Sequence, residues 1–258
     1  MNITIINDCR DANAAGRQIT RVSTLIGNSA SFVGVSSDLE AAGNLIDVLD
    51  AYENSPGVIL VNVAPRNGKA KKWKNGTPFG YFWHKEVLVV SSIDGLTLSL
   101  VKKIGLVDSV HVLDIPKVIE QFISERLISP EVGEYIINTQ FRSYDFLPRI
   151  AAYLLENRYI QSDKMKIEYI ADAPNAIWWV DNFGNCKTTL FTDEIIQPDH
   201  VNTKFGKISY FEWLKDVPDK TTALITGSSG IGDKRFLEIV VQGGSASKIL
   251  NARSADEI

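Results

Sequence analysis

The sequence is poor in the residues that covalent crosslinks and structural metal sites require. It has two cysteines, Cys9 and Cys186, which lie far apart without Cys-x-x-Cys or Cys/His spacing. Neither a disulfide framework nor a structural zinc site is therefore indicated. The three histidines, His84, His111 and His200, also lack ligand spacing, so no metal site is predicted. This cysteine usage leads us to expect a reduced, cytoplasmic setting.

The sequence also lacks an excess of positive charge and a long apolar run. Its formal net charge of -4 at pH 7 offers no broad positive surface for nucleic acid. One basic cluster, at Lys69, Lys71, Lys72 and Lys74, fits a solvated loop better than a phosphate groove. No apolar run reaches the roughly 20 residues that cross a bilayer, and the opening MNITIIND indicates a strand rather than a signal peptide. We expect neither a nucleic-acid partner nor a membrane partner.

The first part of the chain alternates strand and helix patterns. Residues 3–6 and 31–36 read as strands, and a Ser-Asp N-cap precedes an amphipathic helix over 39–52. Residues 58–63 are almost wholly apolar, which is typical of a strand buried on both faces. The alternation predicts an α/β domain with a mainly parallel or mixed sheet.

The pattern changes after about residue 165. Before it, a strand is expected at 87–91, and helices at 115–123 and 146–156. After it come four short strand patterns broken by turns, at 177–180, 187–191, 223–226 and 236–241. We therefore predict an α/β domain over 1–165 and a smaller, β-rich, barrel-like domain over 166–258.

A glycine-rich motif, TGSSGIG at 226–232, resembles the phosphate loop of short-chain dehydrogenases. Its spacing is one residue shorter than that loop, and the chain after it is too short to hold a Tyr-x-x-x-Lys pair. A dinucleotide loop also needs a full strand-turn-helix unit to direct backbone N–H groups at the pyrophosphate. The interpretation that follows is a β-turn loop in the second domain.

The segment 180–185, Val-Asp-Asn-Phe-Gly-Asn, followed by Thr188 and Thr189, supports two interpretations. One is a hairpin whose Asn and Gly supply positive-φ positions. The other is a ligand-binding corner, in which Asp181 receives hydroxyls or an ammonium, Phe183 stacks on a base and Asn185 matches a purine edge. The residues alone leave both interpretations open.

This segment and three others carry a resemblance to one enzyme family. The pattern (I/V)-D-x-F-G-N-x-x-T matches 180–188, and 228–246 is similar to N-S-x-G...L-E-I-A...G-x-A. The opening 3–8 is similar to I-T-L-x-T-D, and 92–96 falls where that family has P-D-N-G-L. In order and spacing the chain resembles the S-adenosylmethionine-cleaving family of hydroxide adenosyltransferases, fluorinases and chlorinases, over nearly its whole length.

The resemblance implies a site for S-adenosylmethionine or a related adenosyl compound, with no further cofactor. Asp8 would receive the ribose hydroxyls, which suits a carboxylate, although an N-cap role is the alternative. The family assembles as a homotrimer, in which the first domain of one subunit and the second domain of its neighbour share a site. The ligand-binding candidates are Asp8, Asn67, Asp181, Phe183, Asn185, Ser228, Ser229 and Gly243.

The chain departs from the family where the hydroxide adenosyltransferases activate water with Asp, Arg and His. Ungapped alignment places Ala64, Lys71 and Phe141 at these three positions. Lys71 keeps a positive charge and is the catalytic candidate, while His84, Arg142 and Asp145 are conceivable replacements. The departing sulfonium already carries positive charge, so the displacement depends on positioning the nucleophile rather than on a general acid.

Two functions are therefore predicted as alternatives. The first is hydrolysis of S-adenosylmethionine to adenosine and L-methionine by attack at ribose C5′. It is favoured over halogenation because no halide pocket is recognisable. The second is a catalytically inactive homologue that binds the adenosyl compound but lacks the water-activating set.

Overall fold

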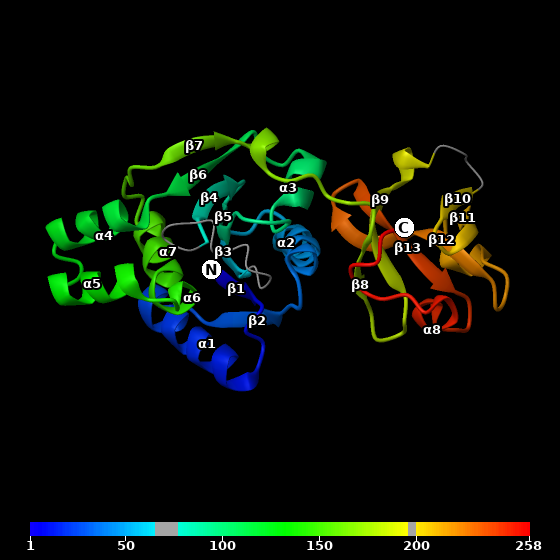
Figure 1. Cartoon of the computed structure of the whole chain (residues 1–258), viewed down its shortest axis with the longest axis horizontal. Helices are drawn as coiled ribbons and strands as arrows, with labels where there is room; N and C mark the ends of the chain where they lie inside the picture. Colours follow the sequence, from blue (N-terminus) through cyan, green and yellow to red (C-terminus); the bar gives the residue numbers. More distant parts are fainter. Residues whose placement is uncertain (65–76, 196–199) are drawn as a thin grey trace. The chain divides into compact units, whose positions relative to one another are not determined.

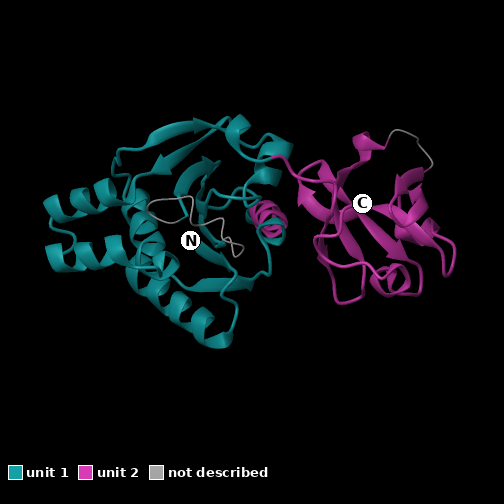
Figure 2. Ribbon diagram, in the orientation of Figure 1, with its two compact units in different colours: residues 1–41, 52–171 teal, residues 42–51, 172–258 magenta. Residues whose placement is uncertain are grey.

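The structure is a computed structural model that describes residues 1–64, 77–195 and 200–258. These residues form two compact units (Figure 2): Met1–Ala41 with Tyr52–Ala171, and Ala42–Ala51 with Asp172–Ile258. The sequence suggested a division near residue 165, whereas the units divide after Ala171, and a stretch of ten helical residues near the start of the chain counts with the second unit. One unit holds a mixed α/β sheet and the other a curled, half-barrel sheet, which confirms the predicted fold class.

The first unit is built on a seven-stranded sheet with the order β2-β1-β3-β5-β4-β6-β7 (Figure 1). Neighbours among β2, β1, β3 and β5 run parallel, and the remaining pairs are antiparallel. The strands are β1 (Asn2–Asn7), β2 (Ala30–Gly34), β3 (Gly57–Asn62), β4 (Phe79–His84), β5 (Val87–Ser92), β6 (Ser109–Leu113) and β7 (Asp163–Lys166).

Burial explains why the parallel strands read as nearly continuous apolar runs. All six residues of β5 and five of the six in β3 are buried, because helices cover both faces of such a sheet. The helices of this part of the chain are α1 (Ala12–Ile26), α2 (Asp38–Tyr52), α3 (Ser99–Ile104), α4 (Ile115–Ser124), α5 (Pro130–Asn138), α6 (Arg142–Asp145) and α7 (Leu147–Leu155), with a 3-10 turn at Ile167–Tyr169.

Helices α1, α4 and α7 all contribute to the core of one sheet face. Val22 of α1, Phe122 of α4 and Ile150 of α7 pack in one apolar cluster with Ile3 and Ile5 of β1. Figure 1 shows α1, α4 and α7 on the same side of the sheet. Successive residues of a strand point to opposite faces, so the neighbours of Ile3 and Ile5 serve the other face.

The start and end of α2 are held by side chains. Ser37 Oγ accepts a hydrogen bond from Glu40 N at 3.1 Å, as expected of the predicted N-cap. At the other end, the Tyr52 hydroxyl donates to Val58 O at 3.3 Å and lies 3.4 Å from Thr4 Oγ1. These contacts fix the last residue of α2 against β1 and β3.

The second unit is a six-stranded sheet with the order β10-β11-β12-β13-β9-β8. Only the β11–β12 pair is parallel among these neighbours in the described residues. The elements are β8 (Ile177–Val180), β9 (Cys186–Phe191), β10 (His200–Thr203), β11 (Gly206–Phe211), β12 (Thr222–Ile231), β13 (Lys234–Val241), α8 (Ala246–Leu250), and 3-10 turns at Thr192–Glu194 and Leu214–Asp216.

Residues 226–231 of the TGSSGIG motif lie within β12, so the β-turn interpretation is corrected to a strand there, and Gly232 alone lies in the turn that leads to β13. Its register against β13 shifts between Thr226 and Gly230, which marks a bulge. A Cβ on Gly227 would approach Glu238 Cγ to 2.5 Å, and one on Gly230 would approach Lys234 O to 2.2 Å. The two glycines therefore allow the close approach of the neighbouring strand.

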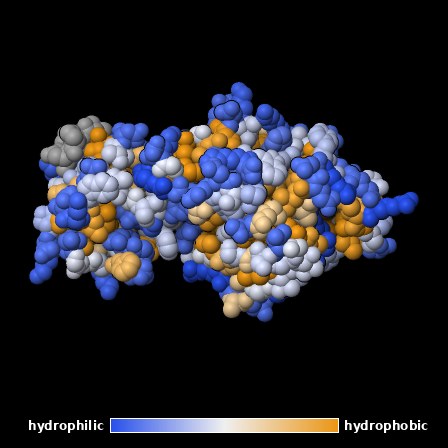
Figure 3. Space-filling model, turned by 180° about the vertical axis from the view of Figure 1, so that it is seen from behind, coloured by the Kyte–Doolittle hydropathy of each residue, from blue (hydrophilic) through white to orange (hydrophobic). Residues whose placement is uncertain are grey.

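Exposed apolar side chains occur in both units. Figure 3 shows hydrophobic groups interspersed with hydrophilic ones on one face of the molecule. The most exposed aromatic residues in the described part of the chain are Tyr159, Tyr169, Phe183 and Phe141. Over the same residues, no helix combines the length and the apolar character needed to cross a membrane, and no cluster of three potential metal ligands occurs.

Two glycines should respond oppositely to alanine substitution. A Cβ on Gly57 would lie 2.0 Å from the Tyr52 ring, whereas one on Gly16 would meet nothing within 4 Å. Gly57→Ala should lower the free energy of unfolding by roughly 1–3 kcal/mol through overpacking. Gly16→Ala, inside α1, should raise it by up to about 1 kcal/mol. Urea unfolding measures both; equal effects would contradict the packing of Tyr52.

Candidate ligand-binding site

The carboxyl ends of β1 and β3 form the most suitable site for a ligand in the first unit. The chain leaves β1 towards β2 on one side, and later returns to place β3 on the other side (Figure 1). In open α/β sheets, ligands bind outside the carboxyl ends of strands at such a reversal. The last residues of β1 and β3 are paired, Asn7 with Asn62, so the residues that follow both strands lie at this edge.

Polar contacts hold the chain where it leaves β1. Asn7 is fully buried; its Nδ2 donates to Gln18 Oε1 at 2.9 Å, and its Oδ1 accepts from Cys9 N at 2.8 Å. Asp8 Oδ2 accepts from Ala64 N at 3.2 Å, which links the two strand ends. The sequence candidate Asp8 is thus placed at the reversal point, with its carboxylate hydrogen-bonded to the backbone rather than capping α1. Asp11 performs that capping role.

The segment after β5 is fixed at the same edge of the sheet. Ser92 Oγ accepts from Val63 N at 3.1 Å. Leu96 N donates to Asp38 Oδ2 at 2.9 Å, and Gly95 adopts a φ of 68° beside the same carboxylate. A Cβ on Gly95 would come within 2.4 Å of Asp38 Oδ2. Glycine is therefore required there by both the backbone conformation and the available space.

The residues at the three positions of the expected water-activating set offer different chemical groups. Ala64 contributes its backbone N–H to Asp8 and has only a methyl side chain. Phe141 precedes α6 and is 67% exposed, with its N–H donating to Thr139 Oγ1 at 3.0 Å. Lys71 and Asn67 lie outside the described residues. Neither described position offers an acid or a base.

Strand register excludes His84 as a group acting at this edge. His84 pairs with Val87, which pairs with Gly57. Gly57 in turn pairs with Asn2 at the opposite end of β1. At about 3.3 Å per residue, the length of β1 puts roughly 16 Å between that level and the carboxyl edge. Burial and the nearby Lys85 also lower the pKa of His84, so it is neutral near pH 7.

The other conceivable replacements, Arg142 and Asp145, belong to α6. Asp145 is 4% exposed and accepts a hydrogen bond from Thr139 Oγ1 at 3.1 Å. Arg142 is partly buried, and its Nε has no hydrogen-bond partner among the described residues. Burial alone lowers the pKa of Arg142 from its ordinary value. Thr139 and Asp145 thus fix the start of α6.

In the second unit, the candidate segment forms the turn between β8 and β9. Asp181 N donates to Asn185 O at 3.0 Å, which closes the turn. Asp181 Oδ1 accepts from Phe183 N and Asn185 N, each at 2.9 Å, and Oδ2 accepts from Asn185 Nδ2 at 3.0 Å. Both carboxylate oxygens therefore organise the turn. The Phe183 ring is 72% exposed, and Gly184 has a φ of 87°.

This turn contacts the second segment of the resemblance. Gly184 O accepts from Ser247 N at 2.9 Å, and a Cβ on Gly184 would lie 2.0 Å from Ser245 Oγ. The preceding Gly243 adopts a φ of 70°, which glycine favours. The turn that carries Asp181, Phe183 and Asn185 thus contacts, through Gly184, the segment that follows Gly243.

Ser228 and Ser229 lie elsewhere in the second unit, on the bulge of β12. Ser228 is exposed, and its N–H donates to Glu238 Oε1 at 3.3 Å. Ser229 is 2% exposed; its hydroxyl donates to Asp47 Oδ2 at 2.8 Å and accepts from Lys187 Nζ. Lys187 also pairs with Glu238 at 3.4 Å. Ser229 is therefore the centre of a buried polar cluster.

The ionisation of Asp47 is coupled to this burial. Desolvation raises the pKa of Asp47, although the hydrogen bonds from Ser229 and Gly230 and the charge of Lys187 act in the other direction. A raised pKa means that the folded state binds the proton more tightly than the unfolded state. Proton binding to Asp47 therefore stabilises the folded state at pH values below the ordinary pKa of an aspartate. This stabilisation is lost as the pH rises through the raised pKa of Asp47.

Sequence reasoning missed the members of this cluster other than Ser229. The signal that could have found them was a single charge inside each of two strand patterns, Lys187 in CKTTLF and Glu238 in FLEIVV. Charged residues are rarely buried unless they are paired, so two such positions predict a partner for each other. The missing third member, Asp47, had no signal because it lies in a distant helical segment.

Comparison with known proteins supports the fold but assigns the chain to no protein family or functional class. A scan of protein-family models and a search of curated proteins each gave no match. An uncharacterized conserved protein from Thermotoga maritima is similar in structure, with a TM-score of 0.66, 17% identity and 98% of each chain covered. A conserved hypothetical protein from Thermus thermophilus matches with a TM-score of 0.57 and 18% identity, covering 98% of this chain and 96% of that one.

The two adjacent serines provide a matched test of the buried cluster. Ser229→Ala removes a hydroxyl that bonds both Lys187 and Asp47, so it should lower the free energy of unfolding by roughly 1–3 kcal/mol. Ser228→Ala, at an exposed position, should change it by less than about 0.5 kcal/mol. Urea unfolding at neutral pH makes the comparison. A neutral Ser229→Ala variant would show that the cluster does not stabilise the fold.

Proposed function

We propose that the protein binds S-adenosylmethionine or a related adenosyl compound at the carboxyl edge of β1 and β3. The observation that supports this most directly is the position of Asp8 at the chain reversal, where open α/β sheets bind ligands. A carboxylate offers about four acceptor sites, so it can receive ribose hydroxyls beside the bond from Ala64 N. The resemblance of residues 3–8 to a ribose-binding strand leads to the same assignment.

By the resemblance, the base would be held by the turn between β8 and β9 of a neighbouring subunit. The exposed Phe183 ring offers a face for stacking. Asn185 donates through Nδ2 to Asp181, which orients its Oδ1 to accept from the exocyclic amine of a purine. Asp181 would then position Phe183 and Asn185 rather than contact the ligand, because both of its oxygens organise the turn. Ser228 and Gly243 remain proposed contacts, whereas the buried hydroxyl of Ser229 suits a supporting role.

Binding is the main proposal, and hydrolysis is conditional on it. Turnover would break the bond between C5′ and the sulfonium sulfur, form a bond between C5′ and water oxygen with release of one water proton, and yield adenosine and L-methionine. Ala64 and Phe141 supply no group that could activate the water, so Lys71 is the remaining candidate among the three aligned positions. The alternative, a protein that binds the adenosyl compound without turnover, follows from Ala64 and Phe141 at the positions of the water-activating set.

A homotrimer is also part of the proposal, and sedimentation analysis of the full chain tests it.

Removing the Asp8 carboxylate should weaken nucleoside binding. Calorimetric titration with adenosine and with S-adenosylmethionine should show an affinity at least about tenfold lower for Asp8→Ala, as for the loss of charge-assisted hydrogen bonds. The exposed Asp219→Ala variant is the matched control and should bind like the original protein. Absence of binding by the original protein, or equal affinity in both variants, would contradict the proposed site.

Turnover separates the two functional alternatives. Full-length protein is incubated with S-adenosylmethionine, and adenosine is followed by chromatography. If hydrolysis occurs, adenosine and methionine should appear in equal amounts, and Lys71→Met should lower kcat while leaving the affinity measured by calorimetry nearly unchanged. Binding without adenosine release would support the inactive homologue and exclude the hydrolase.

A further inference from the structure

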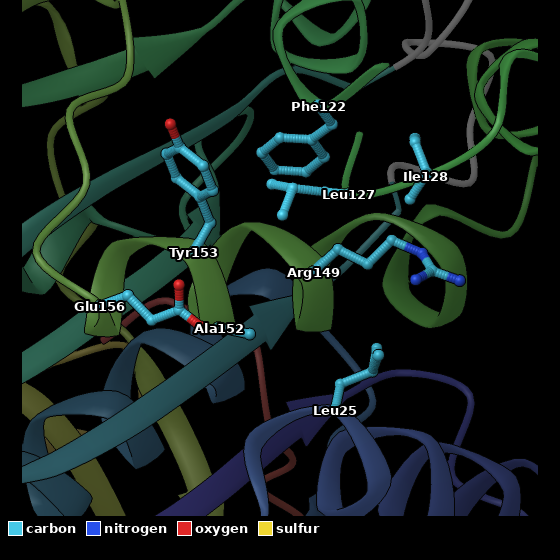
Figure 4. Close-up of a pocket in the computed structure, with 8 residues that line it drawn as sticks. All are labelled: Leu25, Phe122, Leu127, Ile128, Arg149, Ala152, Tyr153 and Glu156. Carbon is cyan, nitrogen blue, oxygen red and sulfur yellow. The ribbon is translucent and has the colours of Figure 1, made fainter. Parts of the chain in front are cut away.

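A cavity in the first unit lies between α1, α7 and the chain that follows α4. Its volume is about 170 Å³. An engineered apolar cavity of about 150 Å³ in another protein binds benzene, so one ring-sized group fits a space of this size. Figure 4 shows the residues around it. The apolar part of the wall consists of Leu25, Phe122, Leu127, Ile128 and Ala152.

One side chain in this wall carries a buried donor. Arg149 lines the cavity, and its Nε–H is buried without a hydrogen-bond acceptor among the described residues. Burial is also the main cause of the lowered pKa of Arg149. The wall of the cavity therefore carries the positive charge of a guanidinium that is incompletely paired within the protein, which favours an anionic ligand.

The surroundings of Arg149 add positive charge. Arg21, one helical turn before Leu25 on α1, is the second cause of the lowered pKa of Arg149. The guanidinium carbons of Arg21 and Arg17 lie 4.3 and 4.9 Å from the centroid of the Tyr144 ring. Asp145 opposes this charge, but it is buried and bonded to a threonine hydroxyl. The charge of Arg21 therefore adds to that of Arg149, and Asp145 is the carboxylate that acts against it.

The polar groups at the other end of the cavity already have partners. Glu156 Oε2 lies 2.8 Å from Arg158 Nε. The Tyr153 hydroxyl donates to Glu125 Oε1 at 2.8 Å and accepts from Gln121 Nε2 at 2.8 Å. In Figure 4, Arg149 extends away from Glu156 along α7, towards Ile128. The cavity thus has a positive end at Arg149 and a paired, neutral end at Tyr153 and Glu156.

We infer that this cavity binds a small amphipathic carboxylate, with a ring-sized apolar body beside Leu25 and Ala152 and its carboxylate on Arg149. A planar carboxylate matches the fork of N–H donors of a guanidinium. Arg21 supplies additional attraction for the anion. None of these residues belongs to the proposed adenosyl site, so the two proposals succeed or fail separately.

Benzoate and benzyl alcohol are the probes for this site, because they have similar shapes and differ in charge. Each is titrated against the full-length protein at neutral pH and millimolar concentrations, and binding is followed by ligand-observed and amide NMR. Benzoate should bind at least about tenfold more tightly than benzyl alcohol, and shift amide signals of α7. Failure of benzoate to bind, or equal binding of the alcohol, would overturn the inference. So would equal binding of inorganic phosphate, which lacks an apolar body.

Variants locate the binding. Arg149→Met should reduce benzoate affinity about tenfold or more, and Ala152→Leu should abolish binding by filling the cavity. Arg253→Met, at an exposed position in the second unit, is the control and should leave it unchanged. Circular dichroism checks the fold of each variant, and Ala152→Leu keeps the test decisive if Arg149→Met does not fold. Unchanged affinity in either folded cavity variant would refute the site.

Discussion

The position of β1 between two parallel neighbours is the constraint on which the first unit and its candidate site depend. Ile5 pairs with Phe32 on one side and with Leu60 on the other, so both edges of the strand are occupied by backbone hydrogen bonds. The strand ends where these partners end, and the polar groups that follow need new partners. Gln18 and Ala64 N supply them, and their contacts fix Asn7 and Asp8 at the carboxyl edge of the sheet.

In the second unit, hydrogen bonds within a single turn hold the candidate residues in place. Asp181 binds three donors within its own turn, which presents Phe183 to solvent and directs Gly184 against the segment before α8. The hairpin interpretation and the ligand-corner interpretation of this sequence therefore do not exclude each other. A turn organised by the aspartate is the means by which an aromatic ring and an amide would be held for a base.

Much of the fold could be predicted because strong local patterns carry it. The apolar runs at β3 and β5 and the capped start of α2 follow from burial on both faces and from a serine cap. The edge strand β10 and its neighbour β11 escaped prediction because their mixed, partly exposed residues lack alternation. β12 escaped in part because its glycines and serines resemble a turn, and only pairing with β13 makes them a strand.

In the candidate sites too, some residues could be predicted from local sequence patterns and others could not. Asp8 and the turn at 181–185 could be found because motif and local chemistry coincide. The place of Asp47 beside Ser229 and Lys187, and the cavity at Arg149, depend on contacts between segments far apart in the chain, which no local pattern records. The proposed adenosyl site depends on Asp8 and the turn at 181–185, and Ala64 and Phe141 weaken the case for catalysis without affecting these residues.

Hydrogen exchange of the full-length protein, with and without saturating S-adenosylmethionine, tests the central claim most directly. The account predicts slower exchange in peptides that contain Asp8 and Ala64, and in the turn at 181–185, with little change around Arg149. Unchanged exchange at Asp8 and Ala64 under conditions where calorimetry detects binding would contradict it, because the ligand would then occupy a different site.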